Sequence, residues 1–400
     1  MTTEIEDYAR QLCGRTDFRS AEIFAKILTP NDDAGRHGVL IPNESCSFFP
    51  ELPVADPQAN ATVLFQGIDA VTGREKDFGW KYYQRYPERR ITRLNARFND
   101  MDHGRRMAIF VRATLPDDSV IYAADVRLEA LDENFNWLIR TLFGEDIAAT
   151  PGAFIRIPVD APTFHIDDAL AELLERYDRV SALGWVTSER TGDTGVGYTF
   201  ETLVGIKENN DQGADFRGIE IKCSTKKPAA SKTNLFQLGP KWMAKQSSFA
   251  RLQQLGQLDS EGSWACYSQV TTSPNNLGLS LALQLSPRDI DLYKGAVRFG
   301  TWDNTRLSKR LLEKHSRAVF VTADSRIMRD QAQYRYHGLV YCERPDIREF
   351  LDMVESRRIV FEFLMHENPP GRVRNHGYPW RLVDQRELGR LFGIQVRLRG

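Results

Sequence analysis

The spacing of apolar residues changes near residue 160, and this change most constrains what the chain can fold into. Before it, short apolar runs are separated by turn residues, at 38–42, 62–65, 107–115, 120–126 and 154–157. Runs of this length and spacing predict the strands of a compact, mainly β domain, in which we also expect helices at 4–13 and 20–28. The segment from Pro158 to Pro162 then has the composition of a connector.

Beyond the connector the apolar residues follow helical spacing. Asp167 and Asp168 can cap a helix whose apolar positions run from Leu170 to Val180 and which ends at Gly184. A further helix is expected at 346–354, with strands at 218–223, 278–285, 318–322, 338–342 and 358–364. Because 400 residues exceed the usual size of a single core, we predict two domains, residues 1–160 and 161–400, in an α/β (α+β) protein.

Composition excludes several classes of protein. The formal net charge is −1, so any nucleic-acid partner must be held by local basic clusters rather than by a global positive field. The N-terminus is acidic and lacks the apolar core of a secretory signal, and no apolar run approaches the roughly 20 residues of a membrane helix. The five cysteines lack metal-ligand spacing and are typical of reduced thiols. We therefore expect a cytoplasmic protein that does not contact a membrane.

The stretch 213–222 has the pattern most suggestive of chemistry. In a strand, Glu220 and Lys222 share one face while two isoleucines share the other. Asp215 lies between flexible glycines and can return to the same end of that strand. Two carboxylates and an ammonium at one point suit Mg²⁺ and phosphodiester hydrolysis, because Mg²⁺ takes hard oxygen ligands and a lysine stabilises charge developing at phosphorus. The alternative is an exposed Glu/Lys pair on a half-buried strand.

A glycine-rich segment, residues 191–201, precedes this stretch and runs into a predicted helix that carries Glu201. Its glycines allow backbone N–H groups to approach a phosphate, and Glu201 can stand beside the metal site. The alternative is an ordinary turn with a surface glutamate.

Residues 371–381 are basic, and we expect them to form a loop. Arginine can donate two hydrogen bonds to guanine, asparagine can pair with adenine, and histidine can donate or accept at a groove edge. The candidates for base recognition are Arg374, Asn375, His376 and Arg381. The alternative is a solvated loop that contacts only phosphates. His366 lies nearby; as a lone histidine it is expected to be structural, and the alternative is that it belongs to the same surface.

A second basic cluster lies in the first domain, where arginines are interleaved with tyrosines and one acid. Arginines suit guanine, a glutamate suits a cytosine amino group, and tyrosines suit the backbone or stacking. The candidate DNA-binding residues of this cluster are Lys81, Tyr82, Arg85, Glu88, Arg89, Arg90 and Arg93. The alternative is a solvated charged face.

The segment from Gly192 to Lys222 resembles the catalytic core of the MvaI/BcnI restriction endonucleases, which are PD-(D/E)xK nucleases. The residues that carry this resemblance are Thr199, Phe200, Glu201, Gly205, Asn209, Asp215, Phe216, Ile219, Glu220, Ile221 and Lys222. It implies that Asp215 and Glu220 hold Mg²⁺, that Lys222 helps to activate the attacking water, and that Glu201 is an auxiliary acid. The family's recognition segment is also similar: Gly371, His376, Gly377 and Arg381 match, whereas Asn375 replaces an aspartate and Arg374 a histidine.

The first domain resembles the EcoRII type of effector domain, a B3-like DNA-binding pseudobarrel. Tyr82, Tyr83 and the run 88–93 match one DNA-contacting arm, although the segment between them is shorter here. The run 28–32 with Gly38, Ile41 and Pro42 matches the other arm, which adds Arg36 and His37 to the candidates; His37 is displaced relative to Gly38.

Together the two resemblances imply a type II restriction endonuclease of the bacterial cytoplasm. It would cut double-stranded DNA with Mg²⁺ at CCWGG, where W is A or T, rather than at the CCSGG of BcnI-like members. The B3-like domain would bind a second copy of the site, and the enzyme would be a monomer. The alternatives are a structure-selective repair nuclease on the same catalytic core and a sequence-specific DNA-binding regulator that uses only the B3-like domain.

Overall fold

The computed structural model describes residues 4–35, 37–52, 58–86, 88–144, 149–161, 164–192, 194–206, 214–225, 232–285, 288–384 and 387–400. Four residues used in the predictions, Arg36, Pro162, Asn209 and Gly213, lie outside these ranges. None of the helices found within them has the length and apolarity needed to cross a membrane.

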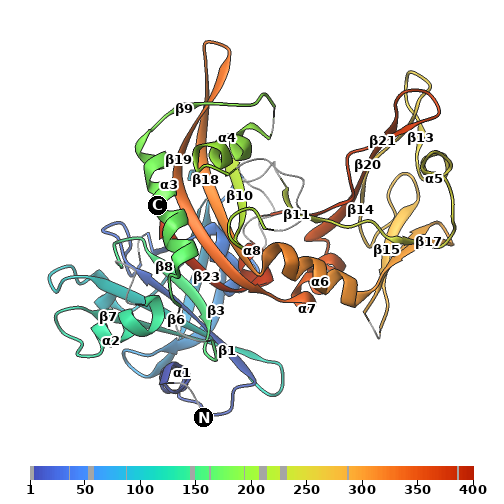
Figure 1. Cartoon of the computed structure of the whole chain (residues 1–400). Helices are drawn as coiled ribbons and strands as arrows, with labels where there is room; N and C mark the ends of the chain where they lie inside the picture. Colours follow the sequence, from blue (N-terminus) through green and yellow to red (C-terminus); the bar gives the residue numbers. More distant parts are fainter. Residues whose placement is uncertain are drawn as a thin grey trace.

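The N-terminal part consists mostly of sheet, as its sequence predicts (Figure 1). It begins with α1 (Glu4–Cys13), which confirms the helix expected there. Its strands are β1 (Ser20–Ile27), β2 (Val39–Ile41), β3 (Ala61–Asp69), β4 (Arg74–Tyr83), β5 (Glu88–Thr92), β6 (Arg106–Thr114), β7 (Val120–Leu128) and β8 (Phe154–Pro158). The short helical turns are η1 (Asn43–Phe48), η2 (Ala96–Asn99), α2 (Phe135–Leu138) and η3 (Ile139–Phe143).

The helix expected at 20–28 is wrong, because Ser20–Ile27 forms strand β1. This strand lies between β6 and β8 and is buried on both of its faces, so that Ile23, Phe24 and Ala25 are all fully inaccessible. A strand buried on both faces loses the alternation of apolar and polar residues, and its continuous apolar run cannot be told from a buried helix by periodicity.

One sheet runs through both parts of the chain. From its far edge the strand order is β10 (Glu220–Thr225), β18 (Arg317–Met328), β19 (Gln331–Pro345), β23 (Phe392–Arg399), then β8, β1, β6, β7, β3, β4, β5 and β2. The junction is the antiparallel pair β8 and β23, where Arg156 faces Gln395 and Ile155 faces Val396. The division into domains at residue 160 stays a prediction, and the chain crosses that boundary with a hydrogen-bonded ladder.

Helices cover one face of this sheet. They are α1, α3 (Asp168–Ala182) and α4 (Gly195–Leu203), and their buried residues form one cluster with strands from both parts, for example Leu12, Leu173 and Phe200 with Val319 and Val396. Helix α3 confirms the predicted capped helix, since the carboxylate of Asp167 accepts a hydrogen bond from the Leu170 N–H at 3.0 Å. Because the cluster includes residues of both parts, they share a core.

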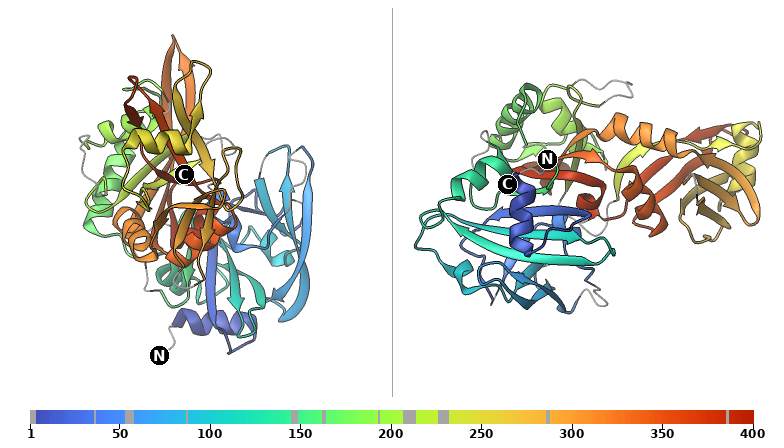
Figure 2. Two further views of the ribbon diagram at one scale, coloured as in Figure 1. Left: turned by 90° about the vertical axis from the view of Figure 1, so that its right-hand side faces the viewer. Right: turned by 90° about the horizontal axis from the view of Figure 1, so that it is seen from below.

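Two smaller sheets project from the C-terminal part (Figures 1 and 2). The first, which we call the projecting sheet, has the order β11 (Thr233–Gln237), β22 (Pro379–Leu382), β20 (Ile359–Glu367), β14 (Trp264–Val270) and β13 (Gln257–Leu258), with β21 (Val373–Asn375) also paired to β20. The second contains β12 (Lys241–Trp242), β17 (Val297–Trp302), β16 (Ile290–Lys294) and β15 (Leu279–Leu283). The remaining elements are α5 (Ser248–Leu255), α6 (Asn304–His315), α7 (Ile347–Glu355), α8 (Leu388–Leu391) and β9 (Val186–Thr187), which pairs with β19.

The predicted loop at 371–381 is wrong in two places, because β21 and β22 are strands that pair with β20. Trp380 in β22 is fully buried and packs edge-on against Trp302, with ring centroids 5.1 Å apart. The burial of this tryptophan fixes β22 against the core, whereas the basic residues around it suggest only a solvated segment.

Candidate active site and nucleic-acid interface

Strand β10 presents the predicted catalytic residues at the edge of the continuous sheet. Ile219 and Ile221 point into the core with 0% and 2% exposure, and Glu220 is also buried at 2%. A tight turn precedes the strand, with Gly218 at a φ of 86°, and it brings Asp215 back beside the strand. The Asp215 carboxylate accepts a hydrogen bond from the Ile221 N–H at 2.9 Å. Asp215 therefore lies at the same end of β10 as Glu220.

Two ammonium groups neutralise the buried Glu220 carboxylate. Lys222 donates to Oε1 from the same strand. Lys314, near the C-terminal end of α6, donates to Oε2 at 3.3 Å. Burial and the negative charge of Glu220 raise the pKa of Asp215, although Lys222 and Lys314 act in the opposite direction. Each carboxylate thus lies within the electric field of the other.

These residues fit a divalent cation. Asp215 and Glu220 supply hard oxygen ligands, and a cation between them would relieve the repulsion that raises the pKa of Asp215. Within the described ranges no group of three or more His, Cys, Asp or Glu side chains is suited to a metal ion. Mg²⁺ keeps several waters and completes its shell with substrate phosphate, so two protein carboxylates are enough.

Glu201 lies on α4, on the covered side of the same strand. Burial first, and then the charge of Glu201, raise the pKa of the Cys223 thiol, which is adjacent to Lys222 in β10. The charge of Asp215 acts on the same thiol. The structure therefore brings Glu201 into the electrostatic environment of the predicted catalytic residues.

One face of the projecting sheet is polar. The opposite face is core, where Phe361, Phe363 and Met365 are buried. The polar face, as we name it, contains Tyr267 and Gln269 from β14, Glu362 and His366 from β20, and Arg381 from β22. Side chains with donors and acceptors on one face of a sheet can form a set that reads base edges.

Arg381 is held in an ion pair on this face. Its Nε lies 2.9 Å from Oε2 of Glu362, which is 8% exposed. Lys232 binds the other oxygen of Glu362 at 2.5 Å and also donates to the Gln269 side chain at 2.5 Å. The sequence did not indicate Lys232, Gln269 or Glu362, although the alternation within 264–270 and 359–367 could have placed the last two on an exposed face.

Aromatic rings occupy the outer end of the polar face. His376 is exposed and stacks on His366 with ring centroids 5.5 Å apart. The Tyr267 hydroxyl lies 2.5 Å from Nδ1 of His366. Arg374 faces His366 across the β20–β21 ladder, and Asn375 accepts a hydrogen bond from the Gly377 N–H at 2.8 Å. His366 is half-exposed and lies beside the predicted reading residues, so it belongs to the same surface, and its role stays a prediction.

The basic cluster of the N-terminal part forms the β4–β5 hairpin, and its candidates divide between two faces. Lys81 pairs with Arg90, whereas Tyr82 pairs with Arg89 on the opposite face. Tyr82 is 8% exposed, with the Arg89 guanidinium 5.5 Å from its ring centroid. The candidates exposed to solvent are His37, Arg85 and Arg93, and Lys81, Glu88, Arg89 and Arg90 are half-buried.

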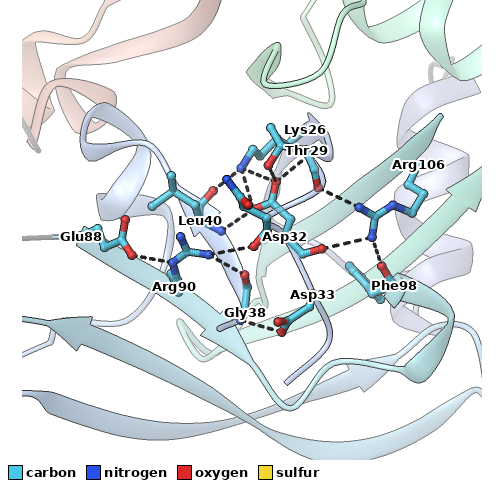
Figure 3. Close-up of polar contacts among 11 residues, drawn as sticks. Lys26, Thr29, Asp32, Asp33, Gly38, Leu40, Glu88, Arg90, Phe98 and Arg106 are labelled. Atoms are coloured by element: carbon cyan, nitrogen blue, oxygen red, sulfur yellow. Dashed lines mark hydrogen bonds and ion pairs between the residues drawn. The ribbon is translucent and has the colours of Figure 1, made fainter. Parts of the chain in front are cut away.

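Arg90 links this hairpin to the segment 28–42 (Figure 3). Its side chain pairs with Glu88 at 2.8 Å and donates to the carbonyls of Asn31 at 3.2 Å and Gly38 at 3.1 Å. Beneath it, Lys26 and Asp32 form a buried ion pair at 3.0 Å. The two predicted arms are thus one hydrogen-bonded unit.

Arg106 fixes the same segment from the other side. Its guanidinium donates to the carbonyls of Thr29 at 2.8 Å, Asp32 at 3.1 Å and Phe98 (Figure 3). The carboxylate of Asp33 accepts hydrogen bonds from the backbone N–H groups of Gly35, His37 and Gly38 at 2.8, 3.1 and 2.9 Å. The backbone that carries His37 is therefore held in place before any ligand binds.

Comparison with known proteins identifies the family of this chain. The family model described as "MvaI/BcnI restriction endonuclease family" matches residues 174–392, more than half of the 400-residue chain. The chain belongs to the MvaI/BcnI restriction endonuclease family. As a member of this family it is a site-specific deoxyribonuclease.

Three solved structures are similar to parts of this chain. The MvaI complex with cognate DNA is 20% identical, covers 58% of this chain and 99% of that chain, and has a TM-score of 0.52, which shows a shared fold. MvaI without DNA has the same identity and coverage and a TM-score of 0.37. The B3 domain of the restriction endonuclease UbaLAI, solved with cognate DNA, is 43% identical and covers 39% of this chain and 99% of that chain, with a TM-score of 0.37. None of the curated protein sequences matches.

Proposed function

We propose that this type II restriction enzyme hydrolyses both strands of double-stranded DNA at CCWGG in a Mg²⁺-dependent reaction. The observation that carries the proposal is the group at the start of β10, where Asp215 and the buried Glu220 meet two ammonium groups at the edge of the sheet. A regulator that only binds DNA does not need a buried carboxylate that contacts two ammonium groups.

The residues of this chain would divide the reaction between them. Asp215 and Glu220 would hold Mg²⁺, which when bound acts as a Lewis acid and favours the hydroxide form of a coordinated water. Lys222 would hold its positive charge beside Glu220, where it can orient the attacking water and stabilise the negative charge on the phosphate. Glu201 would add negative charge from α4, close enough to act on the Cys223 thiol next to Lys222.

Sequence recognition is proposed for the polar face and its outer end. Arg381, His376, Arg374 and Asn375 carry donors that suit base edges in the major groove. The pairing of Arg381 with Glu362 supports this, since an arginine already aligned by a carboxylate loses little side-chain freedom when it binds a base. The choice of CCWGG over CCSGG rests on the resemblance of both parts of the chain to CCWGG-reading proteins.

The N-terminal part is proposed to bind a second copy of the site. Its candidate contacts are His37 on the segment 28–42, Lys81 and Arg85 on the β4–β5 hairpin, and Arg93 directly after β5. A bound second copy would act as an effector or as a tether that raises the local concentration of DNA. With one active site per chain, we expect a monomer to cut the two strands in successive binding events.

Digestion of a sequenced plasmid with Mg²⁺, followed by mapping of the ends, tests this function. We expect ends only at CCWGG, a nicked intermediate on a one-site plasmid, and faster cleavage when a second site is present. Asp215→Ala, Glu220→Ala and Lys222→Ala should each abolish cleavage while cognate binding persists. Cutting of random or branched DNA would instead identify a structure-selective repair nuclease, and Mg²⁺-dependent cutting by any of the three variants would refute the site.

A further inference from the structure

Of the two proposed metal ligands, Glu220 is the one whose carboxylate oxygens both accept a hydrogen bond in the contacts described above. Lys222 donates to Oε1 and Lys314 to Oε2, and the carboxylate itself is only 2% exposed. A buried carboxylate without a partner would be costly, so one of these ammonium groups must remain until a metal replaces it. The two contacts differ in kind, and this difference indicates which one yields.

The contact with Lys222 is local and the contact with Lys314 is not. Lys222 lies two residues from Glu220 on the same strand, and its contact is the shorter of the two. Lys314 comes from α6, 94 residues away in sequence, and its Nζ lies 3.3 Å from Oε2. Charge-assisted hydrogen bonds are strongest at about 2.7–2.9 Å, so the longer contact is the weaker one.

The backbone of Lys314 is nevertheless fixed. The next residue, His315, is fully buried, and its Nε2–H donates to the Leu235 carbonyl at 2.5 Å. This bond joins the last turn of α6 to β11, while Asp303 caps the first turn through the Arg306 N–H at 2.7 Å. The Lys314 side chain is therefore delivered to Oε2 by a helix anchored at both ends.

We propose that Lys314 is a positioning residue that occupies Oε2 of Glu220 in the metal-free enzyme and competes with the divalent cation for that oxygen. The proposal rests on the assignment of Glu220 as a metal ligand. While Lys314 is in place, Glu220 is neutralised, and the ammonium at Oε2 repels a cation that approaches this oxygen. Metal binding then requires displacement of this ammonium, which weakens binding of the cation to the DNA-free protein.

Titration of the DNA-free, full-length protein with Mn²⁺, with free Mn²⁺ followed by electron paramagnetic resonance, tests the competition directly. Removal of a positive charge next to the ligand should tighten Mn²⁺ binding, so we expect Lys314→Met to lower the Kd by roughly tenfold. Lys314→Arg, which keeps the charge, should bind Mn²⁺ as the unaltered protein does. Lys309→Met is the matched control, because Lys309 lies on the same helix with 73% of its side chain exposed and pairs with Glu313.

Weaker or unchanged Mn²⁺ binding by Lys314→Met would overturn the proposal, since removal of an ammonium that competes with the cation must tighten the site. If Lys314→Met fails to fold, as judged by its thermal unfolding, Lys314→Gln takes its place with the same expectation. Glu220→Gln separates this inference from the proposed function: it should lose Mn²⁺ binding at the site. If Glu220→Gln binds Mn²⁺ normally, the metal assignment itself is wrong, whereas its loss together with an unresponsive Lys314→Met refutes only the role of Lys314.

Discussion

The two regions assigned to DNA recognition use their arginines differently. In the N-terminal part, Arg90 donates to two backbone carbonyls of the neighbouring arm, those of Asn31 and Gly38. On the polar face of the projecting sheet, Arg381 pairs with a side chain, the carboxylate of Glu362. Arg90 also pairs with the Glu88 carboxylate at 2.8 Å, so its bonds to main-chain carbonyls of a second segment are what make it a brace of the fold. The contact described for Arg381 is an ion pair alone, and an arginine held in this way can exchange its carboxylate partner for a base.

The surroundings of each arginine strengthen this contrast. If Arg381 turns toward DNA, Glu362 is still neutralised by Lys232 at 2.5 Å. If Arg90 turned away, the exposed Asn31 carbonyl would lose this donor and the Gly38 carbonyl would keep only the longer hydrogen bond from the Asp33 N–H at 3.4 Å, so the two arms would lose the side chain that joins them. Basic residues in a DNA-binding arm are therefore not equivalent. We call an arginine a brace when it donates to main-chain carbonyls of a second segment, and a reader when it remains available to contact a base.

The largest effect should follow from removal of the proposed reader. Arg381→Ala removes a contact worth about 1–3 kcal/mol, or roughly 5- to 150-fold in cognate affinity. Competition binding with cognate and random duplexes measures this, and we expect the loss on the cognate duplex alone. Arg372→Ala is the control, because Arg372 is exposed and lies outside the predicted reading set. An equal loss on random DNA would make Arg381 a phosphate contact.

Removal of the brace should act on stability. Arg90→Met deletes charge-assisted hydrogen bonds to two carbonyls and should cost about 1.5–3 kcal/mol of unfolding free energy. It should also reduce the stimulation by a second DNA site, because the segment carrying His37 loses its support. Arg85→Met on the same hairpin is the matched control for stability, since Arg85 is exposed and its guanidinium lies 5.4 Å from the Tyr86 ring centroid. Equal stability losses in urea unfolding of both variants would contradict the distinction between reader and brace.

Much of the fold could be predicted because its elements have a regular local pattern. Helices α1 and α3 and the strands at 107–115 and 154–157 follow from periodicity, turn residues and a capping aspartate. Strand β1 could not, because burial on both faces removes its alternation. Most strands of the projecting sheets were also missed, since β11, β13 and β21 have five residues or fewer and are held mainly by tertiary packing.

The residues of the candidate site also differ in how far the sequence predicts their contacts. Asp215, Glu220 and Lys222 lie within eight positions of one another, so a strand and a turn are enough to bring them together. Lys314 is 94 residues from Glu220, and Glu362 is 130 residues from Lys232. These contacts depend on how α6 and the projecting sheet are placed, which no local pattern encodes.

The last prediction contrasts the acid sensitivity of the two regions. Burial first, and then the positive charge of Lys222, lower the pKa of His315 from 6.5 to about 3. The unfolded chain therefore binds a proton below pH 6.5 that the folded protein does not, and stability is lost as the pH falls from 6.5 toward 3, by at most about 1.4 kcal/mol per pH unit. Burial alone would raise the pKa of Asp32, but Lys26 and the N–H groups of Thr29 and Leu40 lower it below 3.8, so its stabilising contribution is lost only below that pH.

The two regions should thus respond to acid in separate windows. At about pH 5, amide hydrogen exchange corrected for intrinsic rates should accelerate in α6 and β11 relative to neutral pH, while the amides of β1 and β2 around Asp32 stay protected. His315→Asn should remove the acceleration in α6 and β11, because asparagine does not titrate. His37→Asn should leave it intact, because His37 is exposed in the other region. Parallel acceleration in both regions, or its persistence in His315→Asn, would show that His315 is not the group that makes the catalytic part sensitive to mild acid.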